Sequence, residues 1–255
     1  MKVVRSIFEI AHETIFLLRR GPIFFPAVLF ILVFGVFAII AGSWGVAEFR
    51  KVLFDMGGFG FHFIGSSVAI IWSIKLLAVS RLDGSLEVQL ASPVSRSHWL
   101  LGRFLGIYIS LLMMGFLMLT VWQSIMLFTD FGFFKKTEII SLTLQILGWG
   151  VIAAISLFFA SFCGLITALF SSFALWISGL LTELVALTVK EEVGNTINTL
   201  FQGLSYIWNL QHFNRSTEYI SQHGGYTLLG PSLYAFLLIS FFLCFATLMF
   251  SRSFE

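Results

Sequence analysis

The residues best suited to chemistry in this chain are few and lie far apart in the sequence. His12 and Glu13 form the first half of an HExxH zinc motif, but Phe16 stands where the second histidine ligand is required. Cys163 and Cys244 both fall inside apolar runs, which is typical of packed thiols rather than of a disulfide or a metal pair. We therefore expect no metal site in this chain.

Nucleotide chemistry and nucleophilic catalysis also lack their usual residues. The phosphate-binding pattern GxxxxGK[ST] does not occur, so any ATP hydrolysis must come from another chain. A serine or cysteine nucleophile needs a histidine beside it, and His62 is predicted near the outer end of a span rather than at membrane depth. We expect that this chain is not an enzyme.

Two ionisable residues are predicted inside membrane spans, where a charged side chain is costly and commonly functional. Glu183 is placed near the middle of the fifth span, either as a residue of a polar pathway or as a structural hydrogen-bonding group. Lys75 is placed about five residues from the inner end of the second span, from which its long side chain can reach the headgroups. Only Glu183 is therefore a pathway candidate.

The composition indicates the elements that must position these residues. Hydrophobic residues make up 58% of the 255 and charged residues 11%, and the mean hydropathy is +0.96. These values predict an all-α integral membrane protein, because continuous apolar runs of about 20 residues are typical of spanning helices. The predicted single domain, 1–255, is a bundle of six transmembrane helices at 22–42, 58–80, 99–123, 139–168, 172–190 and 226–250.

Three features of this bundle follow from periodicity and charge. Apolar residues recur at helical spacing over 1–20, which predicts an amphipathic helix in the inner interface. The segment 191–225 is predicted to hold a second amphipathic helix on the outer side, and the turn between the fourth and fifth spans is placed at Ser171 and Ser172. Of the 15 lysines and arginines, more fall on the side of the two termini, so we expect both termini in the cytoplasm.

The segment 81–98 is the most polar connection between two predicted spans, within the run "SRLDGSLEVQLASPVSRSHWLLGR" from residue 80 to residue 103. Asp83 or Ser85 can cap a short helix, and Pro93 ends it. Ser95 can cap the third span, whose end Arg96 and Arg103 are expected to hold at the headgroups. The pattern predicts a stiff rod on the cytoplasmic surface, joined to a span at each end.

The same segment resembles the signature of the type-2 ABC transporter permeases, the ABC-2 family of transmembrane subunits. The resemblance covers about 20 residues closely and, through the six-span layout, the whole chain loosely. It is carried by Gly84, Ser85, Leu86, Glu87, Leu90, Pro93, Arg96, Gly102 and Arg103. The sequence departs from the family pattern at Ser85, Gln89 and Arg103, and at Ser80 and Leu82, where acidic residues are common in the family.

The resemblance implies that residues 82–92 form a coupling helix that docks onto a cytoplasmic ABC ATPase subunit, and that two permease chains form the substrate pathway. ATP and Mg would then bind in the partner ATPase, and this chain would hold no cofactor. The residues expected to couple the ATPase are Asp83, Gly84, Leu86, Glu87, Leu90, Pro93 and Arg96. The resemblance also implies an exporter in a bacterial inner membrane, with lipids around it and no nucleic acid as a partner.

Alternatives remain open at this level. Haem-exporter-type permeases carry a similar "DGSLE" run, and the segment is also consistent with a well-capped connection that has no partner. A self-contained secondary transporter or channel using Glu183 is the alternative function. The sequence does not select a substrate, or decide between a homodimer and a heterodimer.

Overall fold

The computed structural model describes residues 2–20, 25–43, 49–82, 84, 95–192, 208–214, 220 and 228–252. Every regular element in these residues is helical, and five stretches are long and apolar enough to cross a membrane: Phe49–Ala78, Arg96–Phe128, Lys136–Phe162, Leu165–Thr182 and Leu229–Phe250. The elements are α1 (Lys2–Arg20), α2 (Phe25–Ser43), α3 (Phe49–Ile74), η1 (Lys75–Val79), α4 (Ser80–Leu82), α6 (Arg96–Phe128), α7 (Lys136–Phe162), α8 (Leu165–Glu192), η2 (Leu210–Phe213) and α11 (Leu229–Arg252). The predicted class, an α-helical membrane protein, is confirmed.

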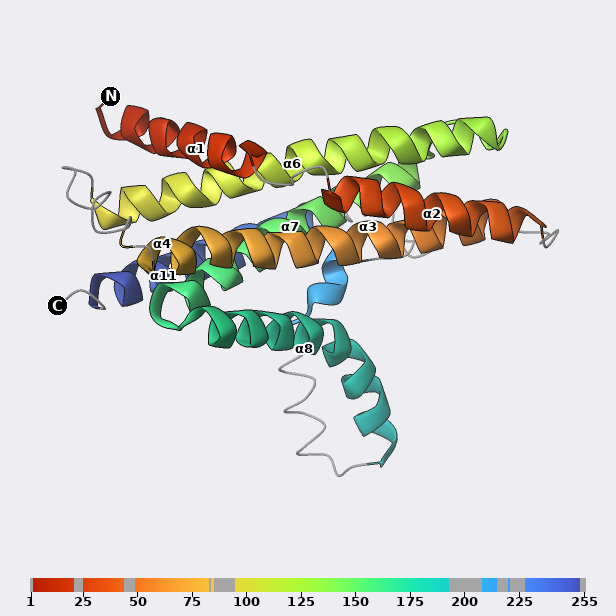
Figure 1. Ribbon diagram of the computed structural model, residues 1–255. Coiled ribbons are helices and arrows are strands. Elements are labelled where there is room, and N and C mark those ends of the chain that lie inside the picture. Colours follow the sequence, from red (N-terminus) through yellow and green to blue (C-terminus); the bar gives the residue numbers. More distant parts are fainter. Residues whose placement is uncertain are drawn as a thin grey trace.

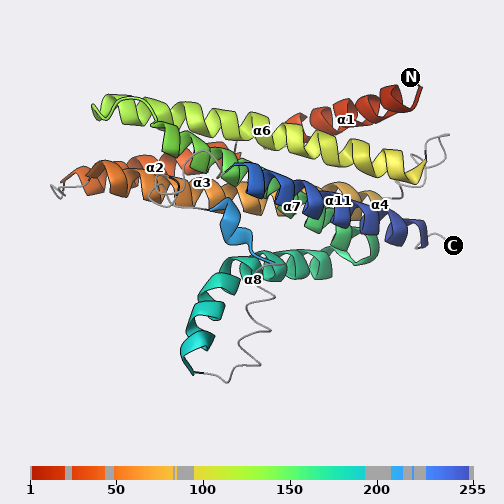
Figure 2. The ribbon, with the colours of Figure 1, turned by 180° about the vertical axis from the view of Figure 1, so that it is seen from behind.

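The helices α3, α6, α7 and α11 run along one common direction, and both termini lie at the same end of this bundle (Figures 1 and 2). We call this end, which also holds α4 and the start of α6, the N/C end, and the opposite end the far end. The helix α2 lies beside α3 and contains a shorter apolar stretch, Val28–Phe37. The count of six spans stays a prediction, since α2 would have to be the sixth.

The helix boundaries bear on two of the predicted spans. The second span is expected to begin at residue 58, and the helix that contains it, α3, begins at Phe49, so where the span itself begins stays a prediction. The missing side chain of Gly57 lets α3 pack on Trp122. A Cβ at Gly57 would lie 2.5 Å from Trp122 Cζ2. The turn expected at Ser171 and Ser172 lies instead at Cys163 and Gly164, since glycine interrupts a helix more readily than serine does.

Two tryptophans form the centre of the bundle. Trp149 of α7 packs against both Gly65 of α3 and Gly115 of α6, so three helices meet at one indole. Trp122 of α6 is surrounded by phenylalanine rings, with ring centroids 5.2 to 6.3 Å away: Phe30, Phe34, Phe54, Phe61 and Phe134. This packing joins α2 and α3 to α6, and such offset and edge contacts add to the dispersion energy of a membrane core.

A nearly buried ion pair joins α3 to α7 at the far end. Arg50 at the start of α3 contacts both carboxylate oxygens of Glu138 in α7, at 3.0 and 3.1 Å. Glu138 also accepts the backbone N–H of Lys135 at 2.7 Å, which caps α7. Arg50 donates in addition to the carbonyl oxygens of Phe131 and Phe133, so the α6–α7 connection is held against α3.

Replacing Glu138 by alanine is predicted to lower the free energy of unfolding by about 2 to 3 kcal/mol, because Arg50 and the Lys135 N–H both lose a charged partner in a nearly buried site. The measurement is a denaturant titration of the purified protein in mixed micelles. Glu9→Ala is the control, since it removes only the exposed ion pair with Arg5 and should leave the midpoint unchanged. Equal midpoints for both variants would contradict a stabilising role of the Arg50–Glu138 pair.

Candidate functional site

The predicted coupling segment is described only at its two ends. Asp83, Leu86, Glu87, Leu90 and Pro93 lie outside the described residues. Gly84 is exposed and has a φ of +68°, a conformation that residues with a side chain rarely adopt.

Arg81 holds the upstream end of the segment against the bundle. The helix α3 passes into a five-residue π-helix, η1, and then into α4, where Arg81 donates to the carbonyl oxygen of Ser161 in α7. The Arg81 guanidinium also lies 5.6 Å from the ring centroid of Phe250 in α11. Burial raises the pKa of the neighbouring Cys163 thiol, although Arg81 opposes this shift, so the thiol stays protonated at neutral pH.

The downstream end of the coupling segment contacts the same ring, that of Phe250. Ser95 caps α6, its hydroxyl accepting the backbone N–H of His98 at 3.4 Å, which confirms the predicted cap. Arg96 follows in the first turn of α6, and Trp99 stacks on Phe250 with ring centroids 5.7 Å apart. Because Arg81 and Trp99 contact the same phenylalanine, the two ends of residues 83–94 lie close together on the N/C end.

The helix α1 packs lengthwise on the start of α6 (Figures 1 and 2). A Cβ at Gly106 would lie 2.5 Å from Cβ of Thr14, so a glycine at this position permits the close approach. Arg103 is 1% exposed and donates to Thr14 Oγ1 at 3.0 Å and to Glu13 at 3.4 Å. The expectation that Arg103 reaches the headgroups is therefore wrong, because α1 covers it and supplies its partners. The predicted interfacial position of α1 stays a prediction.

The two ionisable candidates of the spans lie on different helical elements, η1 and α8. Lys75 is exposed at the start of η1, toward the N/C end, as snorkelling requires. Glu183 lies in the last third of α8, but its side chain is outside the described part of the chain. Its role in a pathway stays a prediction. Among the described residues, no three histidine, cysteine, aspartate or glutamate side chains are grouped as a metal site would need.

Residues 208–214 form an element that the sequence did not indicate. An amphipathic helix on the outer side was expected to include Trp208, and the rest of that helix, 193–207, lies outside the described residues. Residues 208–214 instead pack into the bundle, with Leu210 and Phe213 almost fully buried. A Cβ at Gly148, in the middle of α7, would lie 2.9 Å from that of Phe213. We call residues 208–214 the wedge.

Hydrogen bonds hold the wedge in the bundle. Tyr234 of α11 accepts the backbone N–H of Asn209 at 3.1 Å, and the Asn209 side chain accepts that of Gln211 at 2.9 Å. The Gln211 side chain donates to the carbonyl oxygen of Leu180 in α8 at 2.8 Å, and Gln145 of α7 donates to the Asn214 side chain at 3.3 Å. Because buried polar groups are costly without partners, these contacts allow the wedge to enter the bundle.

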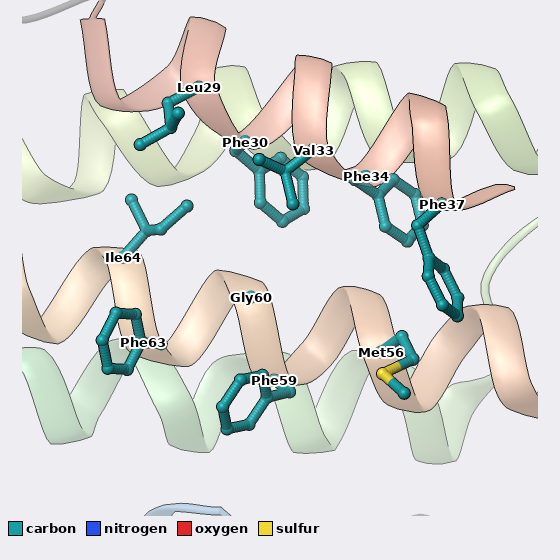
Figure 3. A pocket seen from close by; sticks show the side chains of 10 residues that line it. All are labelled: Leu29, Phe30, Val33, Phe34, Phe37, Met56, Phe59, Gly60, Phe63 and Ile64. Atoms are coloured by element: carbon teal, nitrogen blue, oxygen red, sulfur yellow. The ribbon is translucent and has the colours of Figure 1, made fainter.

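An apolar groove runs between α2 and α3 (Figure 3). It has a volume of about 330 Å³ and is lined by Leu29, Phe30, Val33, Phe34, Phe37, Met56, Phe59, Gly60, Phe63 and Ile64. Gly60 leaves room across from Phe30, and no lining residue is charged or polar. The groove can therefore accept only apolar groups.

The chain was compared with known proteins. No protein-family model matches it, and no curated protein matches it significantly.

Gly148→Val is predicted to displace the wedge, because the added methyl groups would occupy the position of Phe213. A cysteine introduced at Leu210 should then react faster with a charged thiol reagent than it does when Gly148 is intact. Gly35→Val is the control, since nothing lies within 4 Å of a Cβ at Gly35. If Gly148→Val leaves the labelling rate at position 210 unchanged, the wedge is not held at Gly148.

Proposed function

We propose that the chain is the permease subunit of an ATP-binding cassette exporter. The observation that carries this proposal is the position of the two ends of the segment that resembles the ABC-2 signature. Its ends are fixed side by side on Phe250, through Arg81 and Trp99, at the end of the bundle where both termini lie. A displacement of a segment that is anchored at both ends is transmitted to the helices on either side of it, α3 and α6.

The proposed coupling proceeds from residues 83–94 into two helices. A partner that displaces the segment acts on α3 through α4 and the π-helix η1, and on α6 through the capped turn at Ser95. Interruptions such as π-helices are frequent at functional positions, because they can shift without unfolding the helix. ATP binding and hydrolysis would occur in the partner, since this chain carries no GxxxxGK[ST] pattern.

The finer features of the proposal follow from the same resemblance. Six spans with α2 as the first give half of a transporter, so a second permease chain is proposed to complete the pathway. The proposed location is a bacterial inner membrane with the N/C end in the cytoplasm. An ABC ATPase reading frame beside the gene would support this assignment, and the substrate is left open.

Glu87→Arg and Leu86→Asp are predicted to reduce co-purification of the permease with its ATPase by at least about tenfold. Each variant places an unfavourable charge on the proposed docking surface. A loss of about 1.4 kcal/mol of binding free energy lowers the affinity tenfold. The measurement is affinity purification from membranes, followed by quantification of the ATPase subunit.

Lys135→Glu is the matched control, because it alters a charge in the α6–α7 connection at the far end. It should leave the ATPase yield unchanged. Normal yields of ATPase with both Glu87→Arg and Leu86→Asp, from variants that insert as well as the unaltered chain, would reject the coupling assignment.

A further inference from the structure

Four buried polar side chains lie on the helices α3 and α8. His62 of α3 and Trp176 of α8 are in contact, with ring centroids 6.1 Å apart. Ser66 follows His62 by four residues and Ser172 precedes Trp176 by four, so the helical repeat of these two antiparallel helices places both serines one turn closer to the N/C end, on the side of the ring contact. We call these four residues the polar seam.

The seam lies within two candidate spans, Phe49–Ala78 and Leu165–Thr182. His62 is 13 residues from Phe49, which is about 20 Å along the helix. The expectation that His62 lies near the outer end of its span stays a prediction. All four side chains are at least nine-tenths buried, with His62 4% and Trp176 3% exposed.

None of the four has a hydrogen-bond partner among the described residues. The atoms concerned are both ring nitrogens of His62, the hydroxyls of Ser66 and Ser172, and Nε1 of Trp176. Two other buried serines, Ser110 and Ser156, each donate to the carbonyl four residues earlier at 2.8 Å, whereas Ser73 of α3 also has no partner among the described residues. A buried polar group without a partner costs about 1 to 3 kcal/mol, so a group that satisfies several of them at once stabilises the seam.

The residues of the seam suit a small, uncharged ligand that forms hydrogen bonds. Neither residues 56–74 of α3 nor residues 165–182 of α8 include a charged side chain. A neutral imidazole offers one donor and one acceptor, the hydroxyls offer both, and the indole N–H only donates. Water both donates and accepts, and buried waters in proteins bridge polar groups that otherwise lack partners.

The helix α8 also provides a route by which water can reach the seam. Of the five candidate spans it is the least buried, and its last turns bend away from the bundle (Figure 1). The sequence of α8 contains Ser178 and Gly179, a residue pair at which helices commonly kink. A shift of α8 would open the seam while α3 stays packed on α6 and α7.

We propose that the polar seam is a water-binding site inside the bundle, bounded by His62, Ser66, Ser172 and Trp176. Water bound there forms hydrogen bonds with the polar atoms that lack a partner among the described residues, and it allows α8 to separate from α3. The site stands on this geometry alone and does not depend on an ATPase partner.

The test is thiol labelling in nanodiscs, with Cys163 and Cys244 replaced by serine. Ser66→Cys and Ser172→Cys are introduced singly and treated with a small charged methanethiosulfonate reagent. We expect each to react at least about tenfold faster than the two control cysteines. The reagent attacks the thiolate, which forms only where water solvates the charge. A thiol pKa that is one unit lower gives about ten times more thiolate at a given pH. The controls are Met113→Cys, which is exposed on the middle of α6, and Ala153→Cys, which is buried in α7.

A second variant separates hydration from loosened packing. His62→Phe keeps an aromatic ring and removes both ring nitrogens, so it should slow labelling of Ser172→Cys toward the rate of Ala153→Cys. Labelling of Ser66→Cys and Ser172→Cys as slow as that of Ala153→Cys overturns the proposal. Fast labelling that His62→Phe does not slow overturns it as well, because the water would not then be held by His62.

Discussion

Close approach at glycines is the constraint on which the bundle depends. Lipid offers little hydrophobic force between helices, so association relies on dispersion and on shape. Trp149 fills the space that Gly65 and Gly115 leave open, and Trp122 does the same at Gly57. Each indole joins two or three helices, so a methyl group at Gly57 would separate α3 from α6, one at Gly65 would separate α3 from α7, and one at Gly115 would separate α6 from α7. The helices α3, α6 and α7 therefore form a rigid core.

Two of the elements outside this core, α1 and the wedge, are held by polar contacts. Arg103 binds α1 through Thr14 and Glu13, and Tyr234 and Gln145 hold the wedge. The helix α8 contacts the wedge through Leu180 and Ser178, but its Ser172 and Trp176 have no hydrogen-bond partner among the described residues. Because α8 is also the least buried of the five candidate spans, we expect it to move against the core more readily than the other spans.

The sequence predicts the fold class and the local signals well, but not the contacts between distant residues. Continuous apolar runs are enough to predict the helices, and Ser95 at the start of α6 is confirmed as a cap because capping is a local interaction. The packing of the early turns of α3 on Trp122 was not predicted, because Trp122 lies far away in the sequence. The burial of Arg103 depends on α1 in the same way. At the candidate site, residues 83–94 are predicted from pattern alone, whereas the meeting of Arg81 and Trp99 on Phe250 needs the folded chain.

The account is tested most directly by distances between spin labels in nanodiscs, in a chain with Cys163 and Cys244 replaced by serine. One pair, Phe59→Cys with Phe116→Cys, joins α3 to α6 within the core, and another, Phe170→Cys with Phe116→Cys, joins α8 to the core; all three positions are exposed. The account predicts one narrow distance distribution for the first pair and a broad or two-component distribution for the second. Equally narrow distributions for both pairs would contradict it, because α8 would then be as fixed as the core.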